Sequence, residues 1–125
     1  MPEKAYNKDK KVKIFYLIKR RTEEGFTQTI KKYIHPLNKQ LSAYIRDLSP
    51  KEKQEKDEST LLAIINRRDV NNTMFLEYKR RGMSVQTYNI NGVDFYDDSS
   101  SEIKLTLSLV KNKIAYDIEE GTEWK

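Results

Sequence analysis

The sequence predicts a mainly β fold, a small antiparallel β-barrel or sandwich of about six strands with a short helical insertion. Short apolar segments with a period of two recur along the chain, and turn signals separate them at intervals of about 8 to 12 residues. A segment with a helical period interrupts this series once. The chain has 125 residues, which suits one domain with one modest core.

The composition indicates a thin core in a chain that exposes much of its surface. Hydrophobic residues make up 37% and charged residues 34% of the total, whereas eight tyrosines and four phenylalanines supply large apolar areas. The absence of cysteine excludes disulfides and thiolate metal sites, and it suits a reducing cytoplasm. The longest apolar runs are too short to span a bilayer, so we expect no membrane contact and a soluble intracellular product.

The first third of the chain predicts a β-hairpin. Residues 1–11 are polar and lysine-rich, which is typical of a flexible basic arm. Alternation over 12–18 predicts a strand, the charged segment 19–25 ends in a glycine that favours a turn, and 26–34 predicts the second strand. His35 and Pro36 end that strand, because proline lacks an N–H donor.

The segment 37–59 predicts a helical insertion. Apolar residues recur there at spacings of three and four, which places them on one stripe of a helix: Leu37, Leu41, Tyr44, Ile45 and Leu48. Ser49, Pro50 and Glu52 then form a capping arrangement that favours a second helical turn. We expect 37–48 to plug one end of the barrel. For 49–59, the same plugging role and a partner-facing or lumen-facing role both stay open.

Four further strands are predicted between residues 60 and 109. Residues 60–66 are apolar on both faces, and alternation continues over 73–79, 84–90 and 103–109. The parity of the apolar positions shifts at Asn91-Gly92, which predicts a β-bulge. The domain is therefore expected to span 12–110, followed by an acidic tail over 111–125.

No catalytic, metal or cofactor site is predicted, and we expect no enzyme. His35 is the one histidine, and the four glycines stand too far apart for a phosphate loop. The acidic group Asp94, Asp97, Asp98 and Glu102 lacks the ligand pattern of a calcium loop and fits an ordinary turn.

Charge is unevenly distributed along the chain, whose net charge is +5. Residues 1–34 hold 10 basic and 4 acidic residues, whereas 69–125 hold 7 basic and 10 acidic residues. Such asymmetry favours nucleic-acid binding or head-to-tail contacts between copies, or else serves solubility. Basic clusters at the ends of predicted strands are candidates for one phosphate-attracting rim, with solvated turn charge as the alternative: Lys19, Arg20, Arg21, Arg67, Arg68, Lys79, Arg80 and Arg81.

The order of these segments resembles the head-closure, or stopper, family of head-tail joining proteins of long-tailed bacteriophages. The resemblance covers about residues 12–110. It rests on Pro36-Leu37 before the insertion, TLLAIINRRDV at 60–70, MFLEYKRRG at 74–82, YNINGVDFYDD at 88–98 and EIKLTLSL at 102–109. The structural positions that it marks are Pro36, Leu37, Tyr88, Ile90, Gly92, Val93, Ile103, Leu105 and Leu107.

The resemblance implies a structural virion protein of the phage neck, made in the bacterial cytoplasm. It implies a ring, dodecameric in the assembled neck and monomeric when free, with a portal or adaptor protein above and a tail or tail-completion protein below. The ring would extend the DNA channel, close the filled head and contact packaged DNA non-specifically. Lys51, Lys53 and Lys56 are the candidate lumen-facing residues. The alternatives are a neighbouring adaptor or tail-completion protein, or a small monomeric nucleic-acid-binding barrel.

Overall fold

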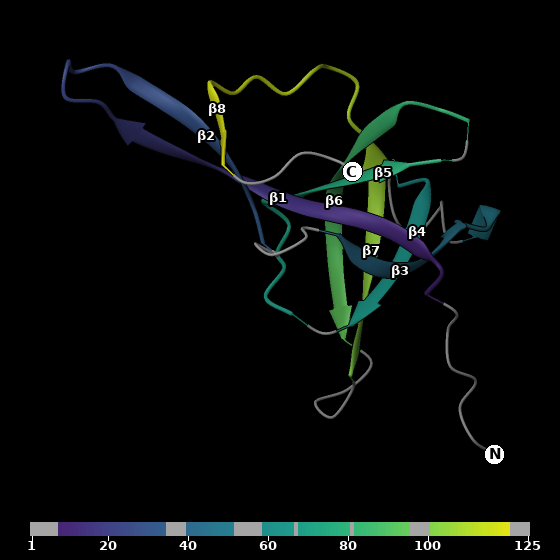
Figure 1. Ribbon diagram of the computed structural model, residues 1–125. Coiled ribbons are helices and arrows are strands. Elements are labelled where there is room, and N and C mark those ends of the chain that lie inside the picture. Colours follow the sequence, from purple (N-terminus) through teal and green to yellow (C-terminus); the bar gives the residue numbers. More distant parts are fainter. Residues whose placement is uncertain are drawn as a thin grey trace.

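The computed structural model describes residues 8–34, 40–51, 59–66, 68–80, 82–95 and 101–120, and these residues form a β-barrel with a projecting hairpin (Figure 1). The strands are β1 (Lys10–Arg21), β2 (Thr27–Tyr33), β3 (Leu41–Asp47), β4 (Leu61–Asn66), β5 (Phe75–Lys79), β6 (Val85–Phe95), β7 (Glu102–Leu109) and β8 (Ile118–Glu120).

The barrel consists of six antiparallel strands in the order β3-β4-β7-β6-β5-β1, and it closes because β1 also pairs with β3. The closing register places Lys10 opposite Ala43 and Val12 opposite Leu41. Closure satisfies the backbone groups that an open sheet would leave at its edges. The predicted fold class, a mainly β protein built on a small antiparallel barrel, is confirmed.

The barrel interior is filled by alternate residues of its strands, as expected for strands with one face toward the core. Among the positions marked in the sequence, Tyr88, Ile90, Ile103, Leu105 and Leu107 are buried there, and Val93 packs against them. The other buried members of this core are Val12, Ile14, Leu41, Ala43, Leu61, Ala63, Ile65, Val70, Leu76 and Tyr78.

Strand β4 is buried on both faces, as its continuous apolar run predicts. Leu61, Ala63 and Ile65 point into the barrel. Leu62 and Ile64 point outward and form a second small cluster with Leu48, against which Tyr44 packs. The segment that follows β3 therefore covers the outer face of β4.

The helix predicted over 37–48 is wrong where the structure describes it, because Leu41–Asp47 is strand β3. The apolar residues of this segment serve two different layers: Leu41 and Ala43 enter the barrel core, whereas Tyr44 and Leu48 join the outer cluster. Because odd-numbered apolar residues face the core and even-numbered ones face the outer cluster, the apolar positions together have spacings of three and four that resemble those of a helix. Pro50 and Lys51 are helical, in agreement with the predicted second turn, while Pro36, Leu37 and residues 52–58 lie outside the described residues.

The predicted β-bulge is present in β6, where the register against β7 shifts between Ile90 and Gly92. Glycine is needed there for close approach: a Cβ on Gly92 would lie 2.8 Å from Oγ1 of Thr106. A left-handed backbone at Gly92 is not the reason, since the positive φ angles among the described glycines belong to Gly25 and Gly82.

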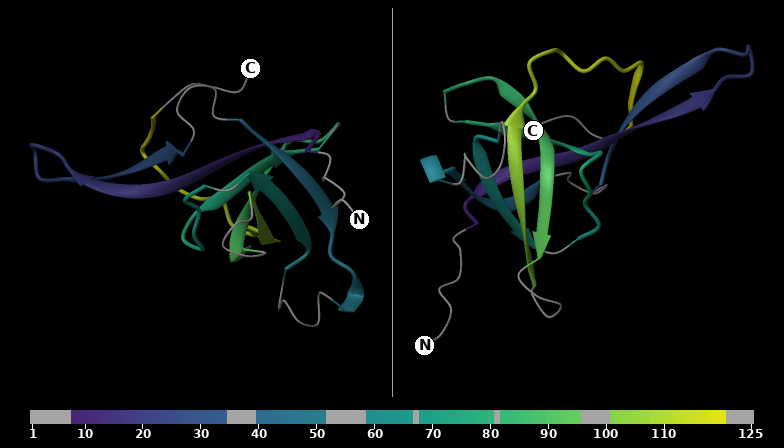
Figure 2. Two further views of the ribbon diagram at one scale, coloured as in Figure 1. Left: turned by 90° about the horizontal axis from the view of Figure 1, so that it is seen from below. Right: turned by 180° about the vertical axis from the view of Figure 1, so that it is seen from behind.

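Strands β1 and β2 continue beyond the barrel as a projecting hairpin, residues 17–30, seen in profile in Figure 1 and Figure 2. Strand β1 pairs with β5 from Val12 to Phe15. From Phe15 to Arg21 it pairs with β2. The strand predicted over 26–34 is thus real but lies outside the barrel, in which β3 takes its place. Two predicted boundaries also change, since the arm contributes Lys10 and Lys11 to β1 and the acidic tail contributes β8, parallel to β2.

Candidate functional site

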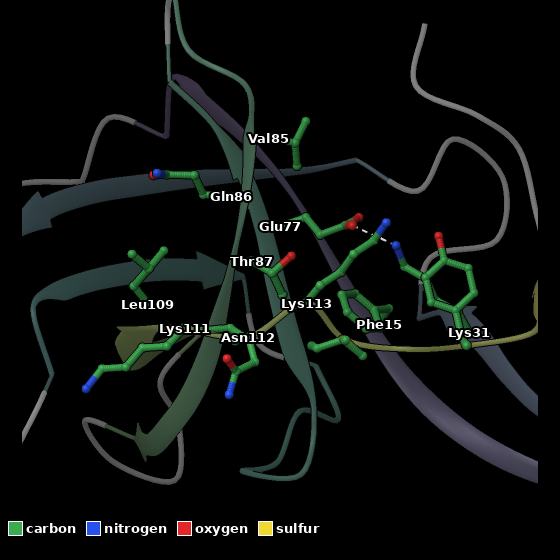
Figure 3. Close-up of a pocket in the computed structure, with 13 residues that line it drawn as sticks. Phe15, Lys31, Glu77, Val85, Gln86, Thr87, Leu109, Lys111, Asn112 and Lys113 are labelled. Carbon is green, nitrogen blue, oxygen red and sulfur yellow. Dashed lines mark hydrogen bonds and ion pairs between the residues drawn. The ribbon is translucent and has the colours of Figure 1, made fainter.

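A groove of about 360 Å³ lies where the base of the projecting hairpin meets the barrel. Its walls come from β1, β2, β5, β6 and the segment that follows β7, as Figure 3 shows. The lining residues are Phe15, Lys31, Glu77, Val85, Gln86, Thr87, Leu109, Val110, Lys111, Asn112, Lys113, Ile114 and Tyr116. Apolar and charged side chains therefore share one concave surface.

A buried ion pair forms the floor of the groove. Lys31 Nζ lies 2.7 Å from Glu77 Oε2, and both residues are almost fully buried. Lys31 also lies 3.3 Å from Glu119 Oε1. A buried charge is tolerated only when its lost hydration is replaced by partners of this kind. Because these side chains belong to β2, β5 and β8, the network joins the base of the hairpin to the barrel.

Aromatic rings complete the surroundings of the Lys31 ammonium. Its Nζ lies 4.5 Å from the ring centroid of Phe15 and 5.0 Å from that of Tyr116. Such contacts with ring faces attract cations. A second buried lysine, Lys13, has its Nζ 5.2 Å from the ring centroid of Tyr33. The hairpin base is thus a mixed aromatic and ionic core, distinct from the apolar barrel interior.

Tyr33 acts as a hydrogen-bond donor in this network. Its hydroxyl donates to Glu77 Oε1 at 2.8 Å, and it lies 3.2 Å from Glu119 Oε1. Burial is the first cause and the hydrogen bond to Glu77 the second that raise the pKa of Tyr33 above its ordinary value of 10.0. The hydroxyl therefore stays protonated over the physiological range.

The segment after β7 crosses from the barrel to the hairpin, as the yellow trace in Figure 1 shows. Residues 110–114 and Tyr116 of this segment line the groove. The Val110 N–H donates to the Thr87 carbonyl at 2.9 Å where the segment leaves the barrel. At its far end Asp117 and Thr29 bond reciprocally: the Asp117 N–H donates to the Thr29 carbonyl, and the Thr29 N–H donates to Asp117 Oδ2, both at 2.8 Å.

The tip of the projecting hairpin presents an aromatic side chain. Phe26 is 71% exposed, and the neighbouring Glu23 and Glu24 are exposed as well. The turn itself is ordered by hydrogen bonds from the Thr22 N–H to the Phe26 carbonyl at 2.7 Å and from the Phe26 N–H to Thr22 Oγ1 at 3.1 Å. Gly25 supplies the positive φ of 88° that the turn requires.

Among the described residues, the three basic clusters predicted for one rim do not all lie at the same end of the barrel. Lys19, Arg20 and Arg21, the basic triplet, are exposed on the projecting hairpin. Lys79 is the last residue of β5 and Arg80 follows it, at the end of the barrel where β6 begins. Arg80 Nη2 lies 3.6 Å from Asp47 Oδ1.

Arg68 follows β4 at the opposite end, where β4 meets the start of β7. Antiparallel pairing therefore places Lys79 and Arg80 at the opposite end of the barrel from Arg68. Arg67 and Arg81 lie outside the described residues.

The candidate lumen residues are described only in part. Lys51 is exposed, whereas Lys53 and Lys56 fall outside the described residues. Within the part of the chain that the structure describes, no group of three or more His, Cys, Asp or Glu side chains is placed to hold a metal ion. The described residues also include no helix with the length and apolarity needed to cross a membrane.

The groove residues were not singled out from the sequence, although one signal was present. Glu77 occupies the middle of an apolar strand, and Lys31 occupies the middle of a strand whose alternation is imperfect. Charges at such positions require partners if the strand is buried. Lys31 and Glu77 are each other's partners but lie 46 residues apart in the sequence, so only the fold identifies the pair.

Comparisons with known proteins establish the fold and nothing finer. Neither the protein-family models nor the curated proteins give a match. Among solved structures, the chain is similar to the solution structure of protein SF1141 from Shigella flexneri 2a, a structural genomics target. The TM-score is 0.65 at 19% sequence identity, and the similarity covers 83% of this chain and 94% of that chain. At this identity the likeness shows a shared β fold.

Proposed function

We propose that the protein is a structural component of a bacteriophage neck, forming a ring under the portal that closes the DNA-filled head and receives the tail. The proposal is supported by the order of sequence segments that resembles the head-closure family. The barrel itself agrees with the fold class that the strand and turn pattern of these segments predicts. A building block of this kind works through complementary surfaces between subunits.

The observation that carries the proposal is the hairpin projecting from a closed barrel. Closure uses the hydrogen-bonding edges of the six barrel strands, so copies do not meet by edge-to-edge pairing of these strands. The projecting hairpin lies outside the barrel, and it presents exposed basic and aromatic side chains. Its contact with a different surface of a neighbouring copy would give the head-to-tail geometry of a ring.

Contact with packaged DNA is proposed to be electrostatic and independent of base sequence. The basic triplet on the hairpin and Lys51 are exposed. Side chains of this kind neutralise phosphates without reading base edges. The same surfaces would line a channel once copies are arranged around an axis.

The test is electron microscopy of lysates from a phage that carries a stop codon early in this gene. Free tails beside heads that have lost their DNA are the expected result. Heads that keep their DNA but lack tails would assign the protein to a neighbouring adaptor or tail-completion layer. Complete infectious particles would refute a role in the neck.

A monomeric nucleic-acid-binding barrel is the second candidate, favoured by the exposed basic triplet. This candidate requires that the free protein bind DNA with an affinity that falls steeply with salt. A ring component would instead bind DNA poorly until many copies are assembled, because each subunit offers few phosphate contacts. Titration of DNA with the free protein at two salt concentrations separates the two.

A further inference from the structure

Two exposed apolar features of the molecule have complementary shapes. One is convex: Phe26 at the hairpin tip, 71% exposed. The other is the groove wall, where Val85, Leu109 and Tyr116 are 36%, 44% and 41% exposed. Exposed aromatic side chains and apolar pockets of this kind are typical of contact surfaces.

The hairpin tip cannot fill the groove of its own molecule. Lys31 lines the groove, and Phe26, which immediately precedes β2, lies five residues earlier in the chain, or about 16 Å away at roughly 3.3 Å per residue. Continuous pairing of β1 with β2 from Tyr33 to Thr27 keeps this segment extended. The occupant of the groove must therefore come from another molecule.

The charges beside the two features are also complementary. Glu23 and Glu24 are exposed on the turn next to Phe26. Lys111 and Lys113 are exposed residues that line the groove, while the third groove lysine, Lys31, is already held by Glu77. The two glutamates of the turn thus match the two exposed lysines of the groove on an identical chain, whereas the adjoining Lys19, Arg20 and Arg21 lie outside this match.

We propose that the hairpin tip of one copy docks in the groove of a second copy. Phe26 then packs against Val85, Leu109 and Tyr116, and the two turn glutamates face Lys111 and Lys113. The contact is heterologous, because each copy uses two different surfaces, and repetition closes a ring or extends a filament. This inference rests on the proposed function, since it identifies how neighbouring subunits would meet.

The contact is tested with two full-length variants. One variant keeps only a functional groove, and the other keeps only a functional tip. Phe26→Ser removes the tip from a ¹⁵N-labelled chain, and Leu109→Lys blocks the groove of an unlabelled chain. Both positions are exposed, so both variants should fold like the parent. Mixing them permits one contact only, so the product is a defined pair that cannot extend further.

Addition of the unlabelled chain should shift the amide signals of Val85, Lys111 and Tyr116 in the labelled chain. When the unlabelled chain also carries Phe26→Ser, binding should weaken by about 10- to 100-fold, as for loss of a buried aromatic anchor. Met83→Ser in the unlabelled chain is the matched control, because Met83 is 48% exposed and does not line the groove. It should leave the affinity within about twofold.

A charge exchange provides an independent reading. Glu23→Lys with Glu24→Lys in the chain that supplies the tip should abolish the shifts, and Lys111→Glu with Lys113→Glu in the labelled chain should restore them. Absence of shifts at about 1 mM of each chain, or shifts confined to other surfaces, would overturn the proposal.

The outcome is distinguishable from that of the proposed function. If the two chains dock in solution but the stop-codon phage gives complete particles, the contact is supported and the role in the neck is refuted. Defective particles without docking would retain the role and refute this contact.

Discussion

Replacement of Glu77 by leucine should destabilise the protein severely, because it removes the main partner of a buried cation. Lys31 is 5% exposed and would lose its 2.7 Å contact, which leaves Glu119 at 3.3 Å as its carboxylate partner among the described residues. Tyr33 would lose a 2.8 Å hydrogen bond. Breaking a buried pair in this way costs about 3–5 kcal/mol, a large part of the roughly 5–15 kcal/mol that holds a domain of this kind folded.

The measurement is urea or thermal unfolding followed by circular dichroism, with four proteins in a double-mutant cycle. Glu77→Leu should lower the thermal midpoint by roughly 10 °C or more. The double variant Lys31→Met with Glu77→Leu should have a free energy of unfolding at least about 2 kcal/mol higher than that of Glu77→Leu alone, because no uncompensated Lys31 charge remains. Glu24→Leu, at an exposed position of the hairpin turn, is the control and should change stability by about 0.5 kcal/mol or less. A cost below about 1 kcal/mol for Glu77→Leu, or a double variant equal to the sum of its singles, would refute the reasoning.

Three further predictions concern the bulge, the tyrosine and the basic surfaces. Gly92→Ala should cost about 1–3 kcal/mol, since its Cβ would lie 2.8 Å from Thr106 Oγ1, and Thr106→Ala should relieve most of that cost; equal costs in both backgrounds, measured by urea unfolding, would contradict the contact. Because the pKa of Tyr33 is raised in the folded state, its contribution to stability is complete below the unfolded value near 10 and is lost as pH rises above it; Tyr33→Phe should remove about 1.4 kcal/mol per pH unit from that decline in alkaline unfolding titrations, and an unchanged slope would contradict it. Replacing Lys51, Lys53 and Lys56 with glutamate should leave folding intact and reduce DNA retention in filled heads, and unchanged retention would remove this segment from the channel.

The predicted strands from residue 60 onward are confirmed because each depends on a short-range pattern. Alternation over 84–90 and 103–109 places one face of β6 and of β7 in the core. Any strand that is buried on one face has such alternating apolar and polar residues, whatever the β fold. The parity shift at Asn91-Gly92 likewise predicted the bulge. Its cause was not predictable, since the close approach of Thr106 belongs to the partner strand.

The failure at residues 41–47 has a different origin. Tyr44 and Leu48 pack outside the barrel on Leu62 and Ile64, whereas Leu41 and Ala43 pack inside. A periodicity argument assumes one buried face, so a strand that serves two layers gives a false helical spacing. The same assumption placed the second strand of the hairpin in the barrel in place of β3.

The sequence by itself determined the mainly β class, most strand positions, the register shift in β6 and the double burial of β4. These are properties of neighbouring residues, and alternation records them directly. Only the tertiary structure decided how the barrel closes, that the first hairpin projects from it, and that Lys31, Tyr33, Glu77 and Glu119 meet at its base. It also scattered the basic clusters that the sequence suggested for one rim. The physical reason is that closure and ion pairing depend on contacts between residues distant in the chain, which local patterns do not encode.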